Sequence, residues 1–216
     1  LSSQTAPVLT ADTTDNYAGN IIEITFIDDP AWRGAVDSVI IVKDGTNQIL
    51  NSPGVSLAEG KLTLDTSQLS WLQKRDPAGV MISIAALNSE TTWVYQPMTS
   101  GIAASIIVDT EPQGPVDNGG VFQSAPVISL YDAYNNKCID GPSSGTAVTA
   151  AKLDTGNWSL GGTTTTTASQ GTVTFGDLSA TNNTGGDITN AQLRFTLDGI
   201  AVTDDSAVFI IPFGFT

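Results

Sequence analysis

Short segments rich in β-branched residues, separated by turn residues, constrain the fold of this chain more than any other feature. In residues 21–27 (IIEITFI), Ile22, Ile24 and Phe26 would lie on one face of a strand. Residues 61–65 (KLTLD) alternate in the same way. Strands of this length, with turn signals between them, are typical of antiparallel β-sandwiches. The other predicted strands are residues 38–42, 80–85, 92–96, 104–108, 126–131, 147–151, 171–175, 191–197 and 207–211.

Two short helical segments interrupt the predicted strands. Residues 30–36 follow an acidic pair and begin with proline, which the first turn of a helix tolerates well. Residues 66–72 begin with Thr-Ser, either of which can cap a helix. We expect Trp32, Trp71 and Leu72 to close the ends of the first hydrophobic core.

A polar segment rich in proline and glycine, residues 109–120, divides the chain into two halves. Such a composition is typical of a linker or a long connection. The predicted fold class is therefore all-β, with two Ig-like antiparallel β-sandwich domains joined by a Pro/Gly-rich linker. The first domain would cover residues 1–108 and the second residues 121–216. The halves share a class of structure but no close internal repeat.

The charge and composition of the chain exclude several functions. The chain has 22 acidic and 8 basic residues, no histidine and one cysteine, and its formal net charge is −14. This surface would repel the phosphates of a nucleic acid. Histidine-based triads and zinc sites are excluded, as are an intrachain disulfide and a cysteine-rich metal cluster. No apolar run reaches the roughly 18 residues of a membrane-spanning helix.

The same composition indicates an extracellular or cell-surface location. Cysteine is nearly absent while Thr, Ser, Asn and Gly are abundant, which fits a secreted prokaryotic protein that does without disulfides. The chain begins Leu-Ser-Ser-Gln, without methionine and without a charged segment followed by an apolar one. We expect a mature chain whose signal was removed, and a cut fragment is the alternative.

The first half resembles a known surface module. Residues 7–16 (PVLTADTTDN) lead into residues 22–33 (IEITFIDDPAWR). This pattern is similar to the start of the Shr-type hemoglobin-interacting module, which is repeated in Gram-positive surface and S-layer-type proteins. The resemblance covers roughly residues 6–108. It implies hemoglobin binding or a spacer role, since the family includes both, and it assigns no contact residue here.

The second half resembles the Ig-like repeats of bacterial adhesins and invasin-type proteins. The similar stretches are residues 127–136, 161–166 and 171–178. Asn135 stands where these repeats usually have glycine, and asparagine tolerates the left-handed backbone region better than most residues. The resemblance implies a structural repeat in a stalk or coat.

Four aspartates are the candidate metal ligands. Calcium prefers six to eight oxygen ligands, which Asp-rich loops at the end of a sandwich can supply. We predict Asp12, Asp15, Asp28 and Asp29 as such a Ca²⁺ site, while the EF-hand spacing does not occur. The alternative is that these residues cap turns and helices on a solvated acidic surface. Carboxylate pairs could also serve a glycosidase, but chance pairing is easy among 22 acids, and we predict that the protein is not an enzyme.

Aromatic residues and the single thiol are the other candidates for binding or reactivity. The four tryptophans could form a sugar-stacking platform or belong to the cores, and Trp158, beside Asn157 and a glycine pair, is expected to be the most exposed. Cys138 could be activated by Lys137 or be a buried, inert thiol.

The terminal segments suggest assembly between copies of the chain. Residues 207–215 are the most apolar stretch, and residues 1–10 carry no charged side chain. Terminal strands exchanged between identical subunits would build a filament. We therefore predict an extracellular structural subunit of a prokaryotic surface layer, stalk or filament. The alternative is a ligand-binding adhesin module with hemoglobin, another host protein or a surface glycan as its partner.

Overall fold

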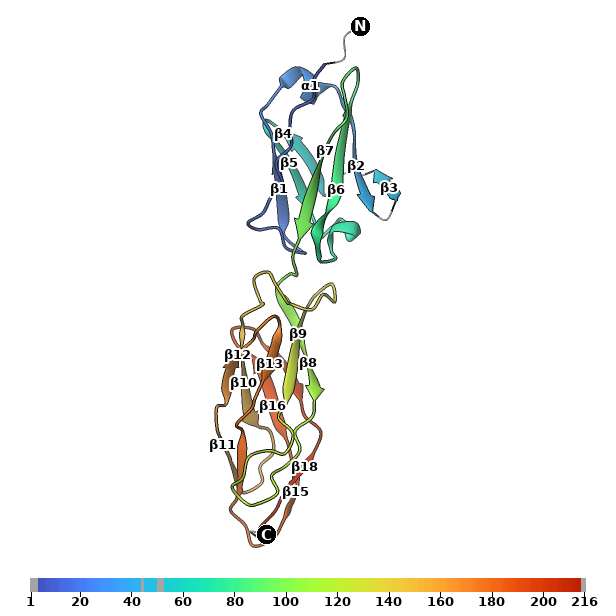
Figure 1. Ribbon diagram of the computed structural model, residues 1–216. Helices are drawn as coiled ribbons and strands as arrows, with labels where there is room; N and C mark the ends of the chain where they lie inside the picture. Colours follow the sequence, from blue (N-terminus) through green and yellow to red (C-terminus); the bar gives the residue numbers. More distant parts are fainter. Residues whose placement is uncertain (1–3, 44, 50–52, 215–216) are drawn as a thin grey trace. The chain divides into compact units, whose positions relative to one another are not determined.

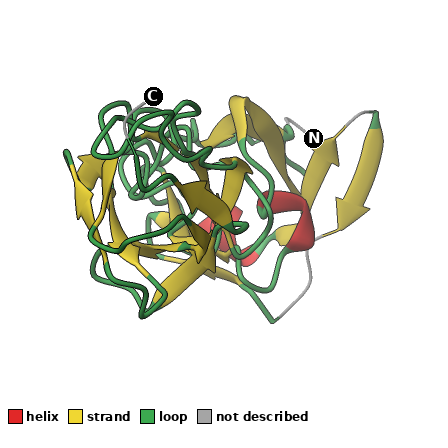
Figure 2. Cartoon of the chain, turned by 90° about the horizontal axis from the view of Figure 1, so that it is seen from below, coloured by secondary structure: helices red, strands yellow, loops and turns green. Residues whose placement is uncertain are grey.

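The computed structural model describes residues 4–43, 45–49 and 53–214. The chain divides into two compact units, residues 1–102 and 103–216. Strands dominate both units, and helix is confined to short segments (Figure 2). All strand pairings within the named sheets are antiparallel. The predicted all-β fold class with antiparallel sheets is confirmed.

Over its described residues, the first unit contains two antiparallel sheets, ordered β1-β5-β4 and β3-β2-β6-β7 (Figure 1). Its elements are β1 (Ile21–Thr25), α1 (Pro30–Gly34), β2 (Val36–Lys43), β3 (Thr46–Ile49), β4 (Val55–Ala58), β5 (Lys61–Asp65), the 3₁₀ turn η1 (Ser70–Leu72), β6 (Asp76–Ala86) and β7 (Thr92–Met98). Alternation along β1 buries Ile22 and Ile24, and the neighbouring strand β5 of the same sheet buries Leu62 and Leu64. These side chains share one core with Ile41, Ile82 and Ile84 of the other sheet.

Local capping explains the short helix of the first unit. Asp29 is the N-cap of α1, and its Oδ1 accepts the backbone N–H groups of Ala31 and Trp32 at 2.9 and 3.1 Å. Pro30 occupies the first helical position, as predicted. Trp32 is fully buried and packs edge-on against Phe26, with ring centroids 5.4 Å apart. The second predicted helix is reduced to η1, whose Leu72 is buried.

The described residues of the second unit form eleven strands around a core of their own. They are β8 (Ala103–Thr110), β9 (Val127–Asp132), β10 (Ala147–Lys152), β11 (Trp158–Gly161), β12 (Thr165–Thr167), β13 (Thr172–Thr174), β14 (Ser179–Asn182), β15 (Ile188–Ala191), β16 (Leu193–Leu197), β17 (Val202–Asp205) and β18 (Phe209–Ile211). The sheets are ordered β12-β10-β16-β17, β13-β9-β8, β11-β14 and β15-β18. Buried aromatic side chains fill the space between the sheets. Among them, Phe175 and Phe195 have ring centroids 5.5 Å apart.

The predicted boundary between the domains differs from the observed one. Residues 104–108 were expected to end the first domain, but they belong to β8, which pairs with β9 of the second unit. The predicted linker, residues 109–120, also lies within the second unit. Its Gly119 N–H donates to the carbonyl of Ala180 at 2.9 Å, and Pro112 and Pro115 are buried. Proline and glycine mark irregular backbone, and composition cannot distinguish a linker from a loop that packs on its own domain.

The described parts of both terminal segments pair within their own units. Gln4 and Thr10 form bridges with Ser89 and Thr25, and β18 pairs with β15. Residues 1–3 and 215–216 of those segments lie outside the described residues, and exchange of terminal strands between copies stays a prediction. No helix in the described ranges has the length and apolar character needed to cross a bilayer.

Asn135 keeps the turn that the adhesin-like pattern requires. Its φ is 61°, in the left-handed region where the usual glycine has no steric penalty. The turn is supported by Asp132, whose Oδ1 accepts the backbone N–H groups of Tyr134 and Asn136 at 2.9 and 2.8 Å. The expectation that asparagine replaces glycine here without loss of the turn is confirmed.

Candidate functional site

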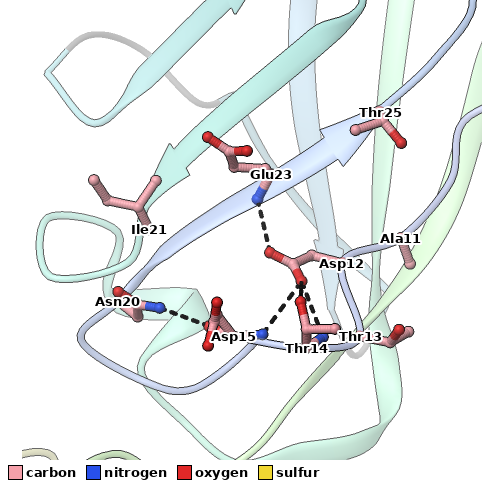
Figure 3. A pocket seen from close by; sticks show the side chains of 9 residues that line it. All are labelled: Ala11, Asp12, Thr13, Thr14, Asp15, Asn20, Ile21, Glu23 and Thr25. Atoms are coloured by element: carbon pink, nitrogen blue, oxygen red, sulfur yellow. Dashed lines mark hydrogen bonds between the residues drawn. The ribbon is translucent and has the colours of Figure 1, made fainter.

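The loop before β1 forms an open acidic depression of about 580 Å³ (Figure 3). Asp12 lies at the centre of this depression. The Asp12 carboxylate accepts hydrogen bonds from backbone N–H groups of the same chain. Oδ1 accepts the backbone N–H groups of Thr14 and Asp15 at 3.1 and 3.4 Å, and Oδ2 accepts that of Glu23 at 3.1 Å. The depression is lined by Ala11, Asp12, Thr13, Thr14, Asp15, Asn20, Ile21, Glu23 and Thr25.

These contacts lower the pKa of Asp12. Burial by itself would raise it, but the hydrogen bonds from Glu23, Thr14 and Asp15 together outweigh that effect. The carboxylate is therefore held in its charged form as the cap of a turn. It fixes the loop against β1, which is a structural role.

Asp28 and Asp29, the second predicted acidic pair, have other hydrogen-bond partners. Asp28 accepts a two-pronged contact from Arg33, with Nε–Oδ1 and Nη2–Oδ2 distances of 2.8 and 3.2 Å, and this contact lowers the pKa of Asp28. Asp29 caps α1 and also accepts the side-chain amide of Gln4 at 2.8 Å. Both residues hold local structure rather than an open coordination site.

The four predicted ligands thus fall into two groups with separate partners. Asp12 and Asp15 lie in the depression before β1, whereas Asp28 and Asp29 serve Arg33 and α1. Within the described ranges, no three His, Cys, Asp or Glu side chains gather in a group that could hold a metal ion. Hydrogen-bond donors of the chain contact the carboxylates of Asp12, Asp28 and Asp29. Calcium binding by the predicted aspartates stays a prediction.

The four tryptophans have different environments. Trp32 and Trp158 are buried, so the expectation that Trp158 is the most exposed is wrong. Trp158 donates to Asp154 at 2.9 Å and carries the Lys152 ammonium 5.2 Å from its ring centroid. Trp71 is partly buried, and Trp93 is 57% exposed. Sequence reasoning did not single out Trp93, whose neighbour Val94 on the other face of β7 is partly buried against the core.

One face of the larger sheet in the first unit is apolar and lies away from the core. Registry places Ile49 (β3), Ile40 (β2), Ser83 (β6) and Trp93 (β7) side by side in one row. The next row contains Asn47, Val42, Met81 and Tyr95. The opposite face carries the buried Ile41, Ile82 and Ile84. We refer to these two rows as the outer sheet face.

Two aromatic rings dominate the outer sheet face. Trp93 and Tyr95 are 57% and 55% exposed, and their ring centroids lie 5.5 Å apart in an edge-to-face arrangement. The two residues follow each other on one side of β7, so the strand holds the rings at a fixed separation. Paired, exposed and preorganised aromatic rings are characteristic of protein-binding surfaces.

A second exposed apolar patch lies in the second unit. Val116, Val208 and Ile210 are between 55% and 60% exposed and surround an open groove of about 380 Å³. The lining that the structure describes contains no charged residue and also includes Pro112, Gln113, Gly114, Pro115, Gln123, Phe209 and Pro212. We refer to this region as the β18 patch.

Cys138 is the buried, inert thiol that the sequence analysis gave as one of two alternatives. Cys138 is fully buried in the second core. Burial, with smaller contributions from the negative charges of Asp132 and Asp140, raises the pKa of the thiol to about 12. Activation by Lys137 is therefore not observed.

A comparison with family models finds a match in the first unit. Residues 9–75 match the family model described as heme-binding protein Shr-like, Hb-interacting domain. This confirms the predicted resemblance of the first half, over about a third of the chain. No curated protein matches the chain.

Among solved structures, the chain is similar to the crystal structure of Down Syndrome Cell Adhesion Molecule (DSCAM) isoform 1.30.30, N-terminal eight Ig domains. The sequences are 11% identical and the TM-score is 0.38. The match covers 96% of this chain and 27% of that one.

Proposed function

We propose that the chain is an extracellular, adhesin-type binding protein whose first unit binds a host protein through the outer sheet face. Hemoglobin is the first candidate partner, since the description of the matched family names it. The observation that carries the proposal is the exposed pair Trp93 and Tyr95. The matched residues 9–75 include β2 and β3, which supply half of the same face.

The chemistry of this face suits a protein partner. Large aromatic side chains already held in place lose little conformational entropy when they bind. Ile40, Val42 and Met81 form a half-buried apolar floor beside them. A face of this kind can form the dry centre of an interface, where a few aromatic residues contribute most of the binding energy.

Binding of the full chain to human hemoglobin, measured with the chain immobilised, tests the proposal. Trp93→Ala and Tyr95→Ala should each weaken binding by at least about tenfold. Val121→Ala is the matched control, because Val121 is 61% exposed but belongs to the second unit. Unchanged binding in both aromatic variants, or an equal loss in the control, would contradict the assignment of this face.

The second candidate is the structural subunit of a surface layer, stalk or filament. The β18 patch favours it, since contiguous exposed apolar surface without charge is a common site of association. Sedimentation of the native chain at increasing concentration tests this function. Val208→Asp should abolish concentration-dependent assembly, while a wild-type chain that stays monomeric at millimolar concentration would exclude assembly through this patch.

A further inference from the structure

Two Asn-X-Ser/Thr sequences, the acceptor sequons of N-linked glycosylation, lie on neighbouring strands of the second unit. They are residues 157–159 (NWS) and residues 182–184 (NNT). The first sequon begins just before β11, the second begins at the last residue of β14, and these two strands pair with each other. In such a sequence the asparagine amide is the acceptor, and the third residue supplies a hydroxyl group. The structure distinguishes between the two acceptors.

The register of β11 and β14 gives the two acceptor asparagines opposite environments. Trp158 and Asn182 are direct cross-strand partners, and both are buried. Asn157 and Ser159 flank Trp158 and are both exposed, as the alternation of side chains along a strand requires. The first sequon therefore presents its amide and its hydroxyl to solvent, whereas the second sequon buries its amide.

The side chain of Asn182 is part of the fold. Its Nδ2 donates to the carbonyl groups of Gly186 and Ile211 at 2.9 and 3.1 Å, and its Oδ1 accepts the backbone N–H of Thr184 at 2.8 Å. Both hydrogens of Nδ2 are therefore in use. A sugar at this nitrogen would replace one of them and would place a bulky polar group beside the buried Ile211. The folded chain is not built to accept a glycan at Asn182.

The side chain of Asn157 can accept a glycan without loss of its contacts. Among the described residues, its Nδ2 has one acceptor, the carbonyl of Asn183 at 3.2 Å. An N-linked glycan replaces only one of the two amide hydrogens, so the other can keep this contact. The carbonyl of Asn157 also accepts the Asn183 N–H at 3.0 Å, and Asn183 Nδ2 donates to the Ser159 hydroxyl at 3.1 Å. Asn183 thus holds the acceptor amide and the sequon hydroxyl together at the surface.

We propose that Asn157 is an N-glycosylation site, whose co-substrate is an oligosaccharide carried on a lipid pyrophosphate and whose catalyst is an oligosaccharyltransferase. In this reaction Nδ2 bonds to the anomeric carbon of the first sugar, and the bond from that carbon to the pyrophosphate oxygen breaks. The lipid pyrophosphate leaves with the electron pair, the amide nitrogen loses one proton, and nothing is oxidised or reduced. The site depends on the extracellular location proposed above and is independent of the outer sheet face.

Incubation of the folded full chain with a purified oligosaccharyltransferase and a lipid-linked oligosaccharide, followed by mass spectrometry of the intact chain and of its peptides, tests the proposal. We expect about one glycan per chain, with occupancy of Asn157 at least about tenfold above that of Asn182, because a buried amide reacts only when the chain opens locally. Equal occupancy of the two asparagines would overturn the proposal. So would an unmodified Asn157 in a reaction that fully glycosylates an unfolded acceptor peptide.

Variants of the third sequon residue locate the modification. Ser159→Ala should abolish glycosylation, while Ser159→Thr, which keeps the hydroxyl, should retain it. Thr184→Ala is the matched control, because it removes the hydroxyl of the second sequon and should leave occupancy within about twofold. The melting temperature of Ser159→Ala should stay within about 2 °C of the wild type, since Ser159 is exposed. Equal loss in Ser159→Ala and Thr184→Ala would exclude Asn157. Trp93→Ala should be glycosylated normally, so this proposal and hemoglobin binding can fail separately.

Discussion

The buried side chain of Gln96 holds the backbone of Asp12 from both sides. Its Nε2 donates to the Asp12 carbonyl at 2.7 Å, and its Oε1 accepts the Asp12 N–H at 2.9 Å. Gln96 lies on β7 and is fully buried, while Asp12 is 84 residues earlier in the chain. The loop that caps β1 through the Asp12 carboxylate is thus fixed to the opposite sheet through the Asp12 backbone.

This relationship predicts the effect of removing the amide. Gln96→Leu keeps the approximate size of the side chain but leaves the N–H and C=O of Asp12 without these partners. We expect a loss of about 2–4 kcal/mol in the free energy of unfolding, measured by denaturant titration. Gln48→Leu on the exposed β3 should change it by less than about 0.5 kcal/mol. A similar small effect in both variants would show that the Gln96 contacts are dispensable.

The lowered pKa values of six aspartates predict that the folded chain loses stability in acid. Lowered pKa values in the folded state are found for Asp12, Asp28, Asp65, Asp154, Asp177 and Asp205, against an ordinary value of 3.8. Below pH 3.8, the unfolded chain binds protons before the folded chain does. The stabilisation is therefore present above this pH and is lost as the pH falls through the lowered values.

Thermal melts between about pH 7 and pH 2 measure this dependence. We expect a plateau above pH 4 and a falling midpoint below it. Asp12→Asn should lower the midpoint at neutral pH and narrow the difference between neutral and acidic conditions, because one of the responsible carboxylates is gone. A midpoint that stays constant down to pH 2 would contradict the explanation.

The environment of Cys138 predicts an unreactive thiol. Because burial raises its pKa to about 12, the thiolate is nearly absent at pH 8 and no reagent can reach it in the folded chain. Ellman's reagent should give no signal with native protein over an hour and one thiol per chain in guanidinium chloride. Stoichiometric reaction of the native protein within minutes would show that the second core opens at this residue.

The hydrogen bonds of the predicted metal ligands predict how calcium and a chelator affect the melting temperature. If calcium bound only the folded chain, it would raise the melting temperature by mass action. Since Asp12, Asp28 and Asp29 already accept donors from the chain, we expect melts with 5 mM calcium and with excess EDTA to agree within about 1 °C. A larger upward shift with calcium would show that a cation site exists and would support the calcium prediction made from the sequence.

Part of the candidate site was accessible to sequence reasoning. The capping role of Asp29 followed from an acidic residue before proline at a helix start, which is a local pattern. The exposure of Trp93 and the burial of Trp158 did not follow, since both residues lie in β-strands and the outcome depends on which sheet face is covered.

The sequence by itself determined the fold class and most strand positions, because alternation of apolar side chains and turn residues are properties of neighbours in the chain. It also determined the acidic charge and the absence of histidine chemistry. Only the tertiary structure decided that residues 103–110 belong to the second unit, because strand pairing joins residues distant in sequence. For the same reason, only the fold showed that the partners of Asp12 and Asp28 are the chain's own donors, and that Trp93 and Tyr95 share an uncovered face.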